Sequence, residues 1–121
     1  MDMKSTHKDL IVWQKSIILV KRIYQVTRCF PHEELMGISS QMRRAAISIP
    51  SNIAEGYGRG TTKELLHFLY IALGSASELD TQIILCKELG FIIDLEVYQE
   101  LYQLNVEVLK MLTALIKSQQ Q

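Results

Sequence analysis

The residue types that most often carry chemistry in helical proteins are few in this sequence. Glu64 and His67 form a Glu-x-x-His pair, the spacing at which one helix presents two ligands to a di-iron centre in a four-helix bundle. Such a centre needs a second pair and further glutamates from other helices, and the sequence contains no second pair. Helix capping by Glu64 and surface exposure of His67 explain the pair better, so we predict no metal and no other cofactor.

Nucleophilic catalysis is not indicated either. Cys29, Cys86 and the serines have no histidine at a suggestive spacing, and His7 and His32 fall in segments predicted to be terminal or loop. Cys86 lies on an apolar stripe and is predicted to be in the core. Two cysteines and no signal peptide predict free thiols in a reducing compartment. We therefore predict a cytoplasmic protein that is not an enzyme.

Basic side chains could bind phosphate groups if they converge on one face. The candidates for nucleic-acid contact are Lys15, Arg22, Arg43, Arg44, Arg59 and Lys63, with Lys21 and Arg28 close to them in sequence. Basic and acidic residues both total 13, so the net charge does not favour nucleic acid. Residues 1–30 carry six basic and two acidic side chains, whereas residues 64–121 carry three and eight. We favour a second explanation, in which the first and last helices lie side by side and complement each other.

Residues 41–60, QMRRAAISIPSNIAEGYGRG, have the most unusual pattern in the chain. A core-facing stripe at helical spacing consists of Met42, Ala45, Ile49 and Ile53. Pro50 interrupts this helix, since it lacks an N–H and its ring crowds the preceding turn, at a cost of about 3 kcal/mol. Ser48, Ser51 and Asn52 can hydrogen-bond freed backbone groups, so we predict one kinked helix. The alternative, a restart at Pro50, would make Ile49 a poor N-cap.

Apolar periodicity predicts four helices, at about residues 10–29, 35–57, 62–89 and 95–118. Short turns between them give an all-α, antiparallel up-down-up-down bundle that forms a single domain over residues 1–121. The most apolar run is too short to span a membrane.

Capping and turn residues set the predicted ends of these helices. Thr61 and Glu64 fit a capping box for the third helix, and Asp94 is a plausible N-cap for the fourth. The turn before the third helix is glycine-rich, and we expect its glycines to tolerate positive φ: Gly56, Gly58 and Gly60.

Several predicted helices are apolar on two strips. On the first, the main seam is predicted to be Leu10, Trp13, Ile17, Val20, Tyr24 and Thr27, with Ile18, Leu19, Ile23 and Val26 beside it. On the third, a second strip is apolar at both ends and polar in the middle: Phe68, Ile71, Ser75, Glu78, Gln82, Leu85 and Leu89. Its centre either faces solvent or pairs Glu78 with Arg43 or Arg44. Paired apolar strips predict association with further copies of the chain.

These motifs together resemble the 23S rRNA-intervening sequence protein family. The matching segments are Leu10-x-Val12-Trp13-Gln14-Lys15, Phe30-Pro31 with Glu34, SQMRRAAISIPSNIAEGYGRG, and Leu69-x-x-Ala72-x-Gly74-Ser75-x-x-Glu78-Leu79. The resemblance implies a bacterial four-helix bundle that assembles as a homopentamer, with no known catalytic residues. We interpret the shared motif residues as structural, fixing the kinked helix and its contacts: Ser48, Pro50, Asn52, Glu55, Gly56 and Glu78.

The family is also similar to the accessory variability protein of diversity-generating retroelements, a basic pentameric barrel that binds nucleic acid and reverse transcriptase. The present chain departs from that protein because it has no net charge. We expect a non-enzymatic oligomeric scaffold that binds RNA or another nucleic acid. The alternative is a protein-interaction module with no nucleic-acid role.

Overall fold

The structure is a computed structural model that describes residues 6–121, and over this range it consists of helices and turns without strands. The long helices are α1 Ile11–Thr27, α2 Ile38–Tyr57, α3 Thr62–Glu88 and α4 Leu95–Gln119, and two short 3-10 helices are η1 His7–Asp9 and η2 His32–Glu34. Each long helix packs against its neighbours in sequence, and α4 packs back against α1. The predicted all-α, up-down-up-down four-helix bundle is confirmed.

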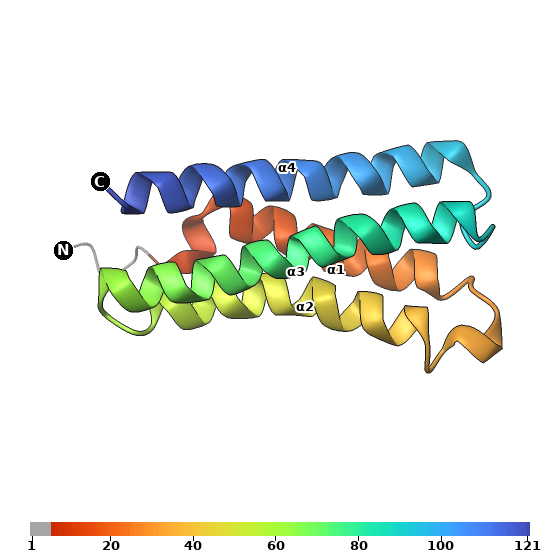
Figure 1. Ribbon diagram of the computed structural model, residues 1–121, viewed down its shortest axis with the longest axis horizontal. Helices are drawn as coiled ribbons and strands as arrows, with labels where there is room; N and C mark the ends of the chain where they lie inside the picture. The colour runs from red at the N-terminus through yellow and green to blue at the C-terminus, as the bar shows by residue number, and fades with distance from the viewer. Residues whose placement is uncertain (1–5) are drawn as a thin grey trace.

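The two ends of the bundle differ in the helix connections that they contain (Figure 1). The α1–α2 and α3–α4 connections lie together at one end, and the α2–α3 turn lies at the other, beside the start of α1 and the end of α4. We refer to these as the corner end and the turn end.

The predicted core stripe of α2 is confirmed. Its four residues are at most 4% exposed, and a stripe on α3 is also buried: Leu65, Leu69, Ala72, Ala76, Leu79, Ile83 and Cys86. For α1 the predicted seam was wrong, because Leu19, Ile23 and Val26 are buried while Trp13 and Val20 are only half-buried. The helix presents two adjacent apolar strips, and contacts with α2 and α4 together decide which of them faces inward.

Local capping explains where α3 and α4 begin. The Thr61 hydroxyl accepts a hydrogen bond from the Glu64 amide at 3.2 Å, and the Asp94 carboxylate accepts one from the Glu96 amide at 2.9 Å. In contrast, α2 begins at Ile38, three residues later than predicted, because the residues before it form a separate 3-10 helix, His32–Glu34. Its N-cap, Gly37, has no side chain with which to cap the helix.

Glycine serves two different purposes near the turn end. Gly60 has a φ of 89°, as predicted, but Gly58 has a φ of −82° and Gly56 lies inside α2. The prediction of positive φ was therefore wrong for Gly56 and Gly58. A Cβ at Gly56 would lie 3.1 Å from Leu65 Cδ1 and 3.1 Å from Phe68 Cβ. Gly56 is needed for the close approach of α2 and α3, not for a turn.

We predict that Gly56→Ala lowers the free energy of unfolding by about 1–3 kcal/mol, because the added methyl group forces α2 and α3 apart. The matched control is Gly74→Ala on α3, where an added Cβ meets no atom within 4 Å. That change should raise the free energy of unfolding by about 0.5–1 kcal/mol through helix propensity. Urea denaturation measures both, and equal effects would contradict the close approach.

Candidate functional site

Two of the six candidate nucleic-acid contacts lie on α1 and face α4. Lys15 forms an ion pair with Glu107, and Arg22 Nε lies 2.7 Å from Glu100 Oε1. All four side chains remain partly exposed. The structure thus supports the explanation that the basic first helix and the acidic last helix complement each other.

The neighbouring arginines of α2 have different surroundings. Arg43 is half-buried, and its Nε donates a hydrogen bond to Thr27 Oγ1 at 2.9 Å. Its guanidinium carbon lies 4.7 Å from the centre of the Tyr24 ring, within the range of a cation–π contact. Arg44 is exposed and forms no ion pair within residues 6–121. Arg43 therefore connects α2 to α1, and only Arg44 of the two faces solvent.

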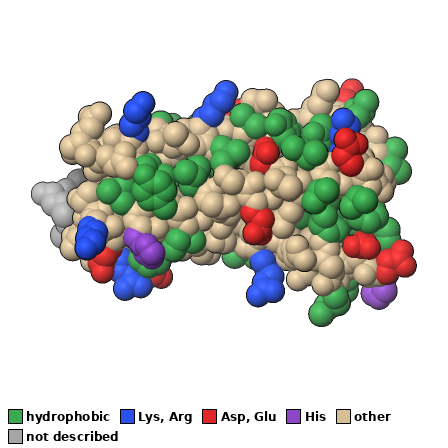
Figure 2. Space-filling model, viewed as in Figure 1, with side chains coloured by type: hydrophobic (Ala, Val, Ile, Leu, Met, Phe, Trp, Pro, Cys, Tyr) green, Lys and Arg blue, Asp and Glu red, His purple; other side chains and the backbone are tan. Residues whose placement is uncertain are grey.

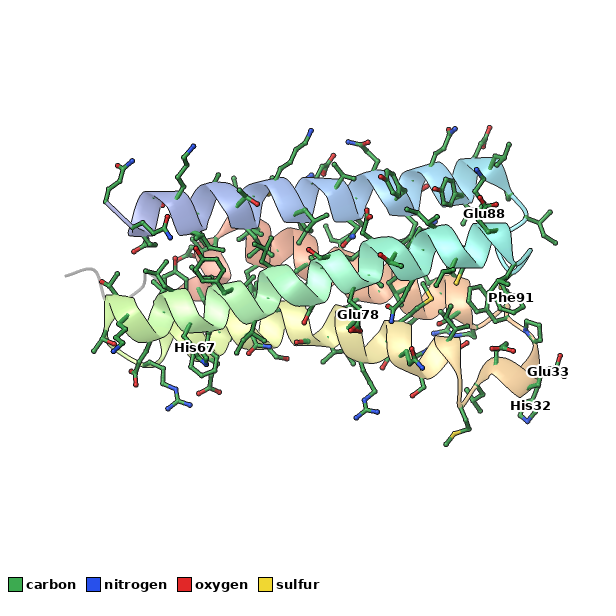
Figure 3. All side chains as sticks on the ribbon, in the orientation of Figure 1. His32, Glu33, His67, Glu78, Glu88 and Phe91 are labelled. Carbon is green, nitrogen blue, oxygen red and sulfur yellow. The ribbon has the colours of Figure 1, made fainter. Side chains whose placement is uncertain are left out.

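The predicted pairing of Glu78 with Arg43 or Arg44 was wrong. Glu78 is exposed midway along α3 and accepts a hydrogen bond from Gln82 Nε2 at 3.3 Å (Figure 3). No ion pair joins it to either arginine among the described side chains. An exposed carboxylate keeps its hydration and does not need a buried partner, so the solvent-facing alternative applies.

The residues around Pro50 connect α2 to α3. Helix α2 continues through Pro50 without restarting, as predicted, and Pro50 itself is buried. The Asn52 amide donates hydrogen bonds to the carbonyl and the hydroxyl of Ser48, both at 2.8 Å, and the Ser75 hydroxyl donates to the Ser48 hydroxyl at 2.8 Å. The carbonyl freed by Pro50 is that of Ala46, so this network stabilises the α2–α3 contact instead of replacing the missing bond.

Only two of the six candidates, Arg59 and Lys63, are brought together. They line one shallow pocket at the turn end with Glu64, His67 and Phe68 (Figure 3 labels His67). The Arg59 guanidinium carbon lies 5.0 Å from the centre of the Phe68 ring. The rings of His67 and Phe68 are arranged edge to face, with 5.1 Å between their centres.

We call Arg59, Lys63, His67 and Phe68 the turn-end cluster. Its charge is partly offset, since Arg59 Nη2 lies 3.0 Å from Glu55 Oε2. Glu55, a motif residue that we predicted to be structural, therefore contacts a candidate nucleic-acid residue.

A second basic grouping was not singled out from the sequence. At the corner end, a pocket is lined by Thr27 from α1, Arg28 directly after it, His32 from η2, and Ser39 and Arg43 from α2. Arg28 and Arg43 are 15 positions apart, and only the reversal of the chain brings them to one place. No spacing rule along a single helix would have found this group.

The side chains provide little for metal or nucleophilic chemistry. Within residues 6–121, no three side chains of His, Cys, Asp or Glu lie close enough together to hold a metal ion. Cys86 is fully buried with Sγ 3.3 Å from Met42 Sδ, whereas Cys29 is exposed, and both are free thiols. Burial, reinforced by the charge of Glu34, raises the pKa of Cys86 to about 12, so this thiol stays protonated at neutral pH.

The fold and its side chains define an antiparallel four-helix bundle in which several polar side chains join one helix to another. No helix within the described range is long and apolar enough to cross a bilayer. The profile of the 23S rRNA-intervening sequence protein family matches residues 8–114, and the chain belongs to this family.

A solved structure supports the same assignment. It is that of a protein of unknown function from the S23 ribosomal protein family of Bacteroides thetaiotaomicron. The two chains are 27% identical, the alignment covers 88% of this chain and 96% of that one, and the TM-score is 0.81. No curated protein matches the chain.

We predict that a thiol reagent labels Cys29 quickly at pH 8 and leaves Cys86 unlabelled in the folded protein. The pKa of Cys86 is about 12, so at pH 8 its thiolate form is rare, and the side chain is also enclosed in the core. Mass spectrometry should count one adduct in buffer and two in denaturant. The Cys29→Ser variant, with no adduct in buffer, is the control, and rapid labelling of that variant would contradict the buried position.

Proposed function

We propose that this protein is a non-catalytic scaffold of the cytoplasm, formed when four-helix bundles associate through the outer face of α3. The observation that supports this most directly is the exposure of large apolar side chains on one strip of that helix. Ile71 is 39% exposed, Leu85 44% and Leu89 60%. Figure 2 shows hydrophobic patches towards both ends of this face, with acidic side chains between them.

The energetics favour covering these side chains. Each large apolar side chain that is moved from water into an interface contributes roughly 1 kcal/mol or more. Polar residues between the two patches, Ser75 and the exposed Glu78, would make the contact specific in register. We call the strip of Ile71, Leu85 and Leu89 the α3 outer strip.

A ring of identical copies needs two different surfaces on each copy. The homopentamer implied by the family resemblance would therefore pair the α3 outer strip with another apolar area. One such area is the groove between α1 and α2, lined by Trp13, Ile17, Ile47 and Pro50. Ile47 is itself exposed. The α3 outer strip and this groove are different surfaces, as a ring of identical copies requires.

We predict that Leu85→Glu lowers the molar mass measured by light scattering towards that of one chain. A charge in the centre of an apolar contact is costly to bury, whereas in the isolated bundle this position is exposed, so helicity and melting should change little. The matched control is Met36→Glu, because Met36 is 89% exposed at the corner end and lies away from α3. A wild-type mass near 13.9 kDa, that of one chain, would contradict the scaffold proposal.

Nucleic-acid binding is a second candidate function, favoured by the turn-end cluster. Two cations, Arg59 and Lys63, stand beside the aromatic ring of Phe68 and the imidazole of His67. Cations contact phosphates and aromatic rings stack on bases, which is how proteins commonly hold single-stranded nucleic acid. The ion pair with Glu55 and the neutral chain both oppose such binding.

We predict that Arg59→Glu with Lys63→Glu weakens RNA binding in a mobility-shift assay. The salt dependence should also become shallower, by a slope of about one for each phosphate that the protein no longer neutralises. The matched control reverses two exposed lysines of α4, Lys110→Glu with Lys117→Glu. Binding that is indifferent to salt, or equally weakened in both variants, would contradict contact at the cluster. Retention of a protein partner without any RNA retention would support the alternative, a protein-interaction module.

A further inference from the structure

The pocket at the corner end is a cavity of about 270 Å³ with an unusual lining. Its ionisable lining residues are Arg28, His32 and Arg43, and no acidic residue lines it. Figure 3 places His32 at this end of the bundle, beside Glu33. Two arginines and no carboxylate therefore line this cavity, in a protein whose overall charge is zero.

Arg43 is held in place before any ligand arrives. Its Nε donates to Thr27 Oγ1, and that hydroxyl donates in turn to the carbonyl of Ile23 at 2.7 Å. The ring of Tyr24 supports the guanidinium plane. These contacts use one nitrogen of the guanidinium group, so the terminal nitrogens can still donate to an oxyanion, and the fixed orientation reduces the entropy cost of binding.

Ser39 adds an independent observation. It lines the cavity, its residue is 1% exposed, and its hydroxyl forms no hydrogen bond with any side chain or backbone group in the described part of the chain. The hydroxyl is not one of the fully enclosed polar atoms that lack a partner, so water in the cavity reaches it. A ligand oxygen in the cavity would replace that water as the partner.

The start of α2 also favours a negatively charged ligand in the cavity. Ser39 lies in the first turn of a 20-residue helix whose N-cap, Gly37, has no capping side chain. The first backbone N–H groups of such a helix lack intrahelical acceptors, and the helix dipole favours negative charge there.

We propose that this cavity binds a phosphate monoester or inorganic phosphate. Donors come from two segments of the chain, Arg28 directly after α1 and Ser39 and Arg43 on α2. A terminal phosphoryl group offers three oxygens to such donors and carries up to two negative charges that match the two guanidinium groups. A phosphodiester has only two free oxygens and one charge, so it satisfies this arrangement less well.

One nearby acid opposes the ligand. The carboxylate of Glu34 lies beside Gly37, since a Cβ at Gly37 would be 3.1 Å from Glu34 Oε1. Glu34 does not line the cavity, but its charge reaches the same helix terminus. Its removal should therefore strengthen anion binding.

The test is a titration of the full-length protein with inorganic phosphate at constant ionic strength, followed by NMR amide shifts or calorimetry. We expect saturable binding that weakens by about three- to tenfold in Ser39→Ala and Arg28→Gln and strengthens in Glu34→Gln. Ser39→Ala removes only an unbonded hydroxyl, so its fold and melting temperature should match those of the wild type. The matched control is Arg44→Gln, an exposed arginine of the same helix outside the cavity.

Absence of saturable binding would overturn the proposal, and so would an equal weakening in Arg44→Gln and Arg28→Gln, which would indicate diffuse charge attraction. Phenyl phosphate should bind like inorganic phosphate and dimethyl phosphate should not, and equal binding of both esters would refute the preference for a monoester. Competition by a 5′-phosphorylated RNA oligonucleotide, but not by its 5′-hydroxyl form, would identify a chain end as the source. Competition by neither oligonucleotide would indicate a small phosphorylated compound.

This site is separate from the proposed scaffold surface. The cavity lies between α1 and α2 at the corner end, whereas the α3 outer strip is on another helix. Phosphate binding should persist in Leu85→Glu, so failure of either proposal leaves the other to be judged on its own measurement.

Discussion

The close contact between α2 and α3 is the constraint on which the rest of this structure depends. Small residues on both helices allow it, and Gly56 is the tightest point, with backbone and side-chain atoms of Leu65 within 3.2 Å of the position of a Cβ. Near the middle of the pair, the hydroxyls of Ser48 and Ser75 lie 2.8 Å apart. With α2 held this way, Arg43 is carried to α1 and Arg59 to the ring of Phe68. Two of the motif residues, Ser48 and Gly56, thus lie at the α2–α3 contact.

Two ion pairs join α1 to α4. Exposed ion pairs such as Lys15 with Glu107 and Arg22 with Glu100 contribute less than about 1 kcal/mol each, but they oppose a shift of α4 along α1. Because these cations face acidic partners, they are poorly placed to bind a polyanion. Two small groups of cations lie at opposite ends of the bundle, Arg59 with Lys63 and Arg28 with Arg43. Any recognition of phosphate by this protein is therefore expected to be local, without a broad basic surface.

The chain belongs to the 23S rRNA-intervening sequence protein family, and a structural relative from the S23 ribosomal protein family is itself of unknown function. The side chains of this chain provide little for catalysis. Cys86 has a raised pKa and is enclosed, and the pair of Glu64 and His67 has no third ligand among the described residues. The surface instead offers apolar strips and donor groups, which are features suited to binding. Assembly and recognition are accordingly the roles that we propose.

The sequence alone determined the four helices, their order and most of their ends, because helical periodicity and capping by Thr61 and Asp94 are local. It did not determine how α1 is rotated, why Gly56 is a glycine, or which partner Arg43 has. Each of these depends on atoms from another helix, and a residue pattern along one helix contains no information about them. The cavity between Arg28 and Ser39 was hidden for the same reason, since the chain must reverse before those side chains meet. Local preferences fix the elements, and tertiary packing decides which side chains meet.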